Sequence, residues 1–234
     1  MIDEISRLNS KAKFFWHRIP INIPVYENGK KNIDIIYFGR VTRQKGAEDF
    51  IKVIGIIVKK YPGIKAGIAG PIDNYYKKHL LNLAAKNGCL KNITFLGFFP
   101  TQLQLHKIIS GAKIYLFPTY NDTIPGTIVE AMFLRVMIIT YQTGGIPDFN
   151  DSEKIVEIVP QGDFEKLAER AIEFLEDDVR REEMMSKAYE YVLNNYGFER
   201  PITELVNIYK EIAGNNGKTA SQKIKQFETK VSLN

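Results

Sequence analysis

The chain has 234 residues, of which 44% are hydrophobic and 25% charged, enough for one large globular domain or two small ones. Its single cysteine, Cys89, excludes an intramolecular disulfide, and no apolar run reaches the roughly 18–20 residues of a membrane-spanning helix. The net charge of +5 resides at the two ends, which argues against a nucleic-acid-binding face on the central part.

Residues 1–31 show no clean periodicity, and Pro20 and Pro24 favour an extended linker over a helix. The polar and lysine-rich residues 214–234 are expected to form a basic, mobile tail. These basic ends are compatible with contact to an anionic membrane surface, although solvated lysine-rich tails are the favoured explanation. With one cysteine and no signal-peptide pattern, we expect a cytoplasmic protein that can be peripheral at the membrane.

Between these ends, residues 32–213 alternate short apolar runs with helical patterns. Strands are expected at 33–38, 64–69, 93–96, 113–117, 136–140 and 155–159, and helices at 47–60, 73–87, 102–110, 126–134, 163–176, 179–194 and 199–213. The strands are apolar throughout, as in sheets covered on both sides. The pattern predicts an α/β domain: a Rossmann-like parallel sheet with helices on both faces, and a helical C-terminus.

The first predicted strand ends in Gly39-Arg40, and Lys45-Gly46 follows just before a helix. Glycines let a backbone approach a ligand closely, and cations beside a helix N-terminus attract phosphate. Arginine can hold a phosphate through two hydrogen bonds, whereas lysine acts as a compact charge. A plain basic surface loop remains an open alternative at this stage.

The next two strands also end at glycines. Gly70 could border a ligand, but termination of its strand is the favoured explanation. Gly97 is followed by Phe98 and Phe99, and either ring could flank a nucleotide base or belong to the core.

The strongest local signal is the stretch from Asp122 to Glu130, which places an acid in a strand-to-helix loop and a second acid in the helix. Carboxylates accept hydrogen bonds from sugar hydroxyls, and two acceptor atoms suit a vicinal diol. The first amides of this helix, from Gly126 and Thr127 on, would face an anion. A capping box formed by Thr127 and Glu130, with Pro125 in the first turn, is the structural alternative, and both can hold together.

Gly144 and Gly145 follow the fifth strand and could form an amide nest for an anion, or a plain turn. The histidines at 17, 79 and 106 show no metal-ligand spacing, so we expect no metal site. No dinucleotide fingerprint follows any predicted strand, which disfavours an NAD enzyme.

Taken in order, these segments resemble the C-terminal half of a family 4 glycosyltransferase of the GT-B fold, over about residues 32–213. The resemblance is carried by Gly39-Arg40, Lys45-Gly46, Ile68-Ala-Gly70, Phe95-Leu-Gly97, Ile114-Tyr-Leu-Phe-Pro118, Glu130-Ala131-Met132, Gly144-Gly145 and Ile208-Tyr209. It implies a domain that binds a nucleotide-diphosphate sugar as substrate, for retaining transfer of a hexose type, with no cofactor or metal required.

The resemblance also implies residue roles. Arg40 and Lys45 would hold the donor diphosphate, Asp122 would contact the donor sugar, and Glu130 would bind the ribose hydroxyls. Arg40, Lys45 and Asp122 are the catalytic candidates. The remaining donor-binding candidates are Gly39, Gly70, Gly97, Phe98, Gly126, Thr127, Gly144 and Gly145, of which Gly97 and Phe98 would border the base.

The sequence departs from the family pattern at several positions. Asp122 and Asp148 stand where glutamate is usual, and Arg135 and Met137 replace a usual glycine and proline. The acceptor domain of a GT-B enzyme should precede residue 32, so this chain would need a separate or missing acceptor domain and would be inactive or weakly active alone.

Two other functions stay open on the sequence. One is a non-catalytic protein that binds a nucleotide sugar or acts as a scaffold. The other is an unrelated Rossmann-like binding module whose basic tails contact an anionic surface.

Overall fold

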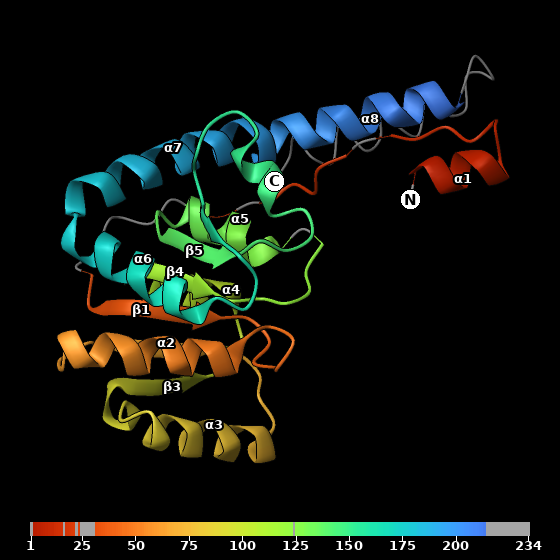
Figure 1. Cartoon of the computed structure of the whole chain (residues 1–234). Helices are drawn as coiled ribbons and strands as arrows, with labels where there is room; N and C mark the ends of the chain where they lie inside the picture. The colour runs from red at the N-terminus through yellow and green to blue at the C-terminus, as the bar shows by residue number, and fades with distance from the viewer. Residues whose placement is uncertain (1, 16, 22, 24–30, 124, 214–234) are drawn as a thin grey trace. The chain divides into compact units, whose positions relative to one another are not determined.

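A computed structural model provides the fold and describes residues 2–15, 17–21, 23, 31–123 and 125–213 (Figure 1). The basic tail expected at 214–234 lies outside the described residues, as does part of the expected linker. The described chain divides into two compact units. One comprises residue 23 and residues 31–193, and the other comprises the described residues up to 21 together with 194–213.

The first unit is built on a parallel sheet. Its strands are β1 (Ile33–Phe38), β2 (Ala66–Ala69), β3 (Ile93–Gly97), β4 (Ala112–Phe117), β5 (Met137–Tyr141) and β6 (Glu157–Val159), in the order β3-β2-β1-β4-β5-β6. The strand order reverses between β1 and β4, where ligands bind in open sheets of this kind.

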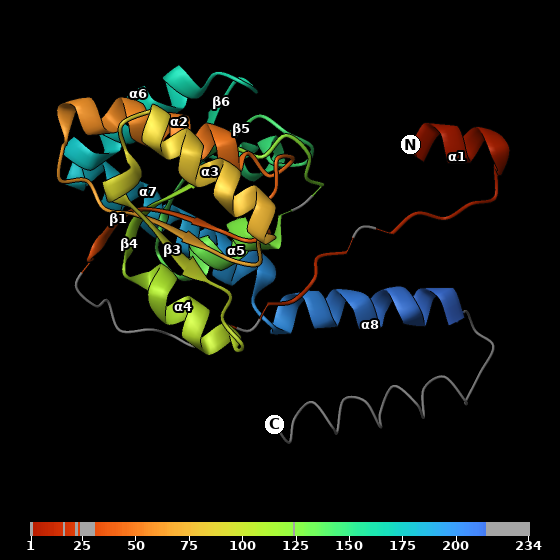
Figure 2. The same ribbon diagram turned by 90° about the horizontal axis from the view of Figure 1, so that it is seen from below.

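Helices cover both faces of the sheet (Figure 2). The helices α2 (Ala47–Lys60), α3 (Asn74–Lys86) and α6 (Phe164–Glu176) lie on one face, and α4 (Gln102–Ser110) and α5 (Gly126–Phe133) lie on the other. Strands β2 and β5 are buried along their whole length. The predicted Rossmann-like sheet with two covered faces is therefore confirmed.

Local signals set where several helices begin. The side chains of Asp73, Thr101 and Asp163 each accept a hydrogen bond from a backbone amide three residues later, which caps α3, α4 and α6. Two short 3-10 turns, η1 (Leu90–Asn92) and η2 (Pro147–Asn150), complete the connections. The last helices are α7 (Asp178–Tyr196) and α8 (Glu199–Ala213), so the helical C-terminus is also as predicted.

Two strands, β2 and β6, begin two residues later than predicted because side chains form hydrogen bonds with their backbone groups. Nδ2 of Asn92 donates to the carbonyl of Ile64 at 2.9 Å, and β2 begins only at Ala66. Oδ1 of Asn150 accepts from the amides of Ile155 and Val156, and β6 begins only at Glu157.

The second unit contains α1 (Ile2–Leu8) and α8. The amide of Ile21 donates to the carbonyl of Tyr196 at 3.1 Å, and Lys13 forms an ion pair with Glu211 at 3.7 Å. The absence of helix predicted for residues 1–31 is wrong for α1. A seven-residue helix is shorter than the window in which helical periodicity can be recognised.

Candidate functional site

Two loops meet at the carboxyl ends of β1 and β4. Residues 39–46 connect β1 to α2, and residues 118–125 connect β4 to α5, with residue 124 outside the description. Gly46 has φ of +75°, and a Cβ placed there would lie 1.8 Å from the carbonyl oxygen of Pro118. The amide of Tyr120 donates to the carbonyl of Gln44 at 2.9 Å. Glycine at position 46 is therefore what allows the loops to touch.

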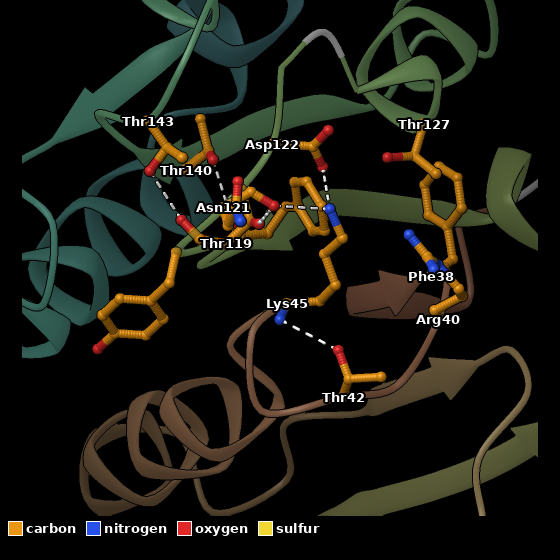
Figure 3. Close-up of polar contacts among 12 residues, drawn as sticks. Phe38, Arg40, Thr42, Lys45, Thr119, Asn121, Asp122, Thr127, Thr140 and Thr143 are labelled. Carbon is orange, nitrogen blue, oxygen red and sulfur yellow. Dashed lines mark hydrogen bonds and ion pairs between the residues drawn. The ribbon is translucent and has the colours of Figure 1, made fainter.

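Lys45 is held between these loops, as Figure 3 shows. Its Nζ donates to Oδ2 of Asp122 at 2.6 Å and to the carbonyl of Asn121 at 2.8 Å. Both charged side chains are 16% exposed, so the ion pair is only partly screened by water. Oγ1 of Thr42 accepts from the Lys45 amide at 3.3 Å, which fixes the backbone at the same point.

The β4 loop is itself fixed by threonines. Oγ1 of Thr140 donates to the carbonyl of Phe117 at 2.6 Å, and Oγ1 of Thr143 donates to that of Thr119 at 2.8 Å (Figure 3). Both threonines are buried. The Asn121 carbonyl, which accepts a hydrogen bond from Nζ of Lys45, therefore belongs to a loop that buried hydrogen bonds hold in place.

Arg40 is placed differently from Lys45. Its backbone carbonyl accepts a hydrogen bond from the Tyr37 hydroxyl at 2.8 Å, while its side chain is exposed. Burial raises the pKa of Tyr37, so its phenol stays a neutral donor at neutral pH. Among the described residues, the Arg40 guanidinium has no hydrogen bond or ion pair, and it remains available for an anion.

The N-terminus of α5 lies beside Arg40 and Lys45. Pro125 is its N-cap, and within the described chain no side chain caps the helix. The predicted capping box is therefore wrong. Oγ1 of Thr127 lies 3.0 Å from the Tyr115 hydroxyl, which donates to the carbonyl of Phe38 at 3.0 Å. The first amides of α5 keep their donors for another acceptor.

Glu130 lies one turn further along α5, with its side chain 19% exposed. Its Oε2 is 3.6 Å from Nε2 of His106 on α4, and the His106 side chain is 6% exposed. A capping-box glutamate would instead turn back to the helix N-terminus.

These groups surround a cavity of about 370 Å³. Its lining contains seven of the predicted residues, Gly39, Arg40, Lys45, Asp122, Gly126, Thr127 and Glu130, together with Phe38, Pro71, Gln102, Leu105, Phe117 and Pro125. Two cations, two carboxylates and an uncapped helix N-terminus thus converge on one hollow, which can bind an anion and accept hydroxyl donors.

A larger hollow of about 490 Å³ lies at the opposite edge of the sheet, near Asn32, Lys65 and Lys91. That edge holds the amino ends of the strands and the C-termini of the helices. None of the described residues that line this hollow lies at the N-terminus of an α-helix, so the smaller cavity is the better candidate.

The other predicted residues do not line the smaller cavity. Gly70 packs behind it, because its amide donates to the carbonyl of Gly97 and a Cβ there would lie 1.8 Å from the Gly39 carbonyl oxygen. Phe98 is 69% exposed, so it is not a core residue. Its contact with a base stays a prediction.

Gly144 and Gly145 support the β4 loop. Gly145 donates its amide to the carbonyl of Thr123 at 2.8 Å, and a Cβ on Gly144 would lie 1.7 Å from the Asp122 carbonyl oxygen. The Gly145 amide is therefore engaged by the protein itself, as in a structural turn.

Sequence reasoning missed Tyr115 and His106. A phenol inside the apolar run of β4 and a histidine on the sheet-facing side of α4 were the available signals.

No group of three or more His, Cys, Asp or Glu that could hold a metal occurs in the described part of the chain. Likewise, none of the described helices is both long and apolar enough to cross a bilayer.

Comparison with known proteins supplies a family. A family model described as "Glycosyl transferases group 1" matches residues 19–191. The alpha-D-kanosaminyltransferase of Streptomyces kanamyceticus is 22% identical over 178 residues, which are 76% of this chain and 45% of that protein. This chain spans about half the length of the curated relatives that it matches.

Solved structures agree on the fold. A variant of S. aureus TarM in complex with fondaparinux, alpha-GlcNAc-glycerol and UDP matches 87% of this chain and 41% of its own, with a TM-score of 0.73 and 18% identity. The C-terminal domain of the LpcC glycosyl transferase group 1 family protein from Francisella tularensis matches 73% of this chain and 89% of its own, with a TM-score of 0.65 and 22% identity. The C-terminal-like Rossmann domain of a GT-B protein is thus confirmed as the fold.

Proposed function

Because the chain belongs to the glycosyl transferases group 1 family, we propose that it binds a nucleoside-diphosphate sugar as the donor of a retaining hexosyl transfer. One observation carries the proposal: Arg40, Lys45, Asp122, Glu130 and the N-terminus of α5 converge on one cavity. The TarM structure contains UDP, which supports a nucleotide in the corresponding fold.

Each group has a chemical task in this proposal. Arg40 and Lys45 hold the diphosphate, and the amides of Gly126 and Thr127 extend the positive potential toward it. As the glycosidic bond breaks, negative charge develops on the leaving diphosphate, and these groups stabilise it. Asp122 contacts the donor sugar and Glu130 accepts hydrogen bonds from the ribose hydroxyls. In this proposal these positive groups alone stabilise the leaving diphosphate, and no resident metal or cofactor is required.

The acceptor is bound elsewhere in this proposal, by a separate or additional acceptor-domain polypeptide. The chain alone would therefore bind donor but transfer sugar weakly or not at all. We place the protein in the cytoplasm, with its basic ends available to an anionic membrane surface and with no nucleic-acid partner.

The test is a calorimetric titration of the whole chain with UDP, GDP and ADP and with their common sugar conjugates. We expect one nucleotide to bind selectively, and Lys45→Ala and Glu130→Ala each to weaken that binding by at least tenfold. Lys113→Ala is the matched control, because that lysine pairs with Asp34 at the opposite edge of the sheet. Absence of binding to every nucleotide, or equal binding by the Glu130 variant, would reject the donor site.

A non-catalytic nucleotide-sugar-binding or scaffold protein is the second candidate. The ion pair between Lys45 and Asp122 favours it, since each residue already satisfies the other in the cavity. Glycosyl transfer by the chain, alone or with an acceptor-domain polypeptide, would exclude this alternative.

A further inference from the structure

His106 occupies a position in α4 that apolar residues normally take. His106 as a whole is 5% exposed, and Ile109, one turn later on the same face of the helix, is fully buried. Burying an imidazole costs free energy unless a polar partner compensates it. A structural reason for a histidine at this position is therefore needed.

One polar neighbour of His106 is a carboxylate on α5 that faces the cavity. Oε2 of Glu130 lies 3.6 Å from Nε2 of His106, so the two side chains are in contact, while the Glu130 side chain keeps a 19% exposed fraction and lines the hollow. The histidine thus approaches the carboxylate from the buried side, and the ligand would approach it from the open side.

A carboxylate that accepts hydrogen bonds from both hydroxyls of a ribose must be oriented so that each of its oxygens faces one hydroxyl. A free glutamate side chain has several rotatable bonds, and ordering them on binding costs free energy. A contact that fixes one oxygen beforehand reduces this cost.

We propose that His106 is a positioning residue that fixes the Glu130 carboxylate as a preorganised acceptor for the vicinal hydroxyls of the donor ribose. The inference rests on the proposed donor site and deepens it. His106 does not touch the ligand, and it acts only through Glu130. Its loss should therefore weaken recognition of the ribose hydroxyls and leave the diphosphate contacts of Arg40 and Lys45 intact.

The experiment compares the nucleoside diphosphate that binds the whole chain most tightly with its 2′,3′-dideoxy form, by calorimetry. The wild-type chain should prefer the hydroxylated form by about tenfold, because hydrogen bonds to a carboxylate are strong. His106→Leu fills the buried volume without a polar atom and should reduce the preference to about twofold, with affinity for the dideoxy form unchanged. His106→Gln retains a donor and should keep most of the preference.

Ile109→Val is the control for a general loosening of α4, and it should keep the tenfold preference. If His106→Leu binds both nucleotides more weakly to the same degree, or keeps the wild-type preference for the hydroxylated form, the proposed role of His106 is overturned. Glu130→Ala separates the two proposals. If it abolishes the preference while His106→Leu does not, only the present inference fails. If the wild-type chain binds neither form, the donor site itself is rejected and this inference with it.

Discussion

At the scale of single residues, the central feature is the ion pair inside the cavity. Lys45 and Asp122 are 2.6 Å apart, and each is only 16% exposed. In a binding site for a diphosphate, the lysine helps and the nearby carboxylate opposes the ligand's charge. Asp122 therefore carries two expected effects of opposite sign: it orients Lys45, and it repels phosphate.

Replacing Asp122 by asparagine should separate these effects. The variant keeps a side chain of the same size but removes its negative charge. We expect it to bind the nucleoside diphosphate about two- to fivefold more tightly, because one repulsive charge is lost within a few ångströms. It should gain less for the nucleotide sugar, whose sugar would lose its contact with the carboxylate.

The measurement is the ratio of the two affinities in Asp122→Asn and wild type, obtained under identical ionic strength. Asp122→Glu restores the charge and should return the ratio toward that of wild type. Weaker binding of the nucleoside diphosphate by Asp122→Asn would mean that orientation of Lys45 outweighs repulsion, contrary to this expectation.

At the scale of elements, α5 has two contrasting ends. Its N-terminus lacks a side-chain cap, whereas its C-terminus is closed by two backbone bonds, from Arg135 to Met132 and from Val136 to Ala131. This is the Schellman arrangement, in which the residue after the C-cap adopts a left-handed conformation. Arg135 has φ of 51°, a region that strongly favours glycine.

The strain at Arg135 is accompanied by a side-chain contact, since its guanidinium carbon lies 3.9 Å from the centre of the Tyr189 ring on α7. We expect Arg135→Gly to be nearly neutral in the wild-type background, because relief of strain and loss of this contact each amount to about 1 kcal/mol. In a Tyr189→Leu background, where no ring remains, the same change should stabilise the protein by about 1 kcal/mol.

Urea denaturation of the four variants in this cycle gives the coupling directly. The same destabilisation by Arg135→Gly in both backgrounds would show that the left-handed conformation costs little here. The measurement does not involve the donor site, because neither residue lines its cavity.

The elements also show what the sequence could and could not predict. The continuous apolar runs around Ile36 and Ile139 predict strands covered on both faces, and the glycines after the strands mark the correct edge of the sheet. The capping box failed because Thr127 meets Tyr115, a residue twelve positions away whose hydroxyl is buried. Pairings such as Glu130 with His106 depend on which helices are neighbours on one face, and local pattern does not encode that.

At the scale of the whole molecule, burial raises the pKa of several phenol and thiol groups. The tyrosines at 37, 115 and 141, on three neighbouring strands, are fully buried, and burial raises the pKa of each phenol. Burial also raises the pKa of the Cys89 thiol to about 11. Lys31 has the opposite sign, since burial lowers its pKa to about 8.

These shifts predict how stability depends on pH. A buried phenol keeps its proton in the folded state while the unfolded chain loses it near pH 10, so its contribution is complete below pH 10 and falls above it. The thiol contributes in the same direction from about pH 9. Lys31 makes the protein more stable as pH rises from about 8, because the unfolded chain holds that proton longer, and this gain levels off only above the ordinary lysine pKa of 10.5.

Above pH 10 the phenols dominate, and three of them should together lower the free energy of unfolding by about 3 kcal/mol between pH 10 and pH 11. Urea denaturation at pH 9, 10 and 11 measures this slope. Tyr141→Phe removes one ionisable phenol and should reduce the loss by about one third, although it also removes the hydrogen bond to Asp49 at every pH. Absorbance at 295 nm provides the independent check, because the buried phenols should ionise only as the chain unfolds. Full ionisation of all twelve tyrosines at pH 11 in a protein that is still folded would contradict the prediction.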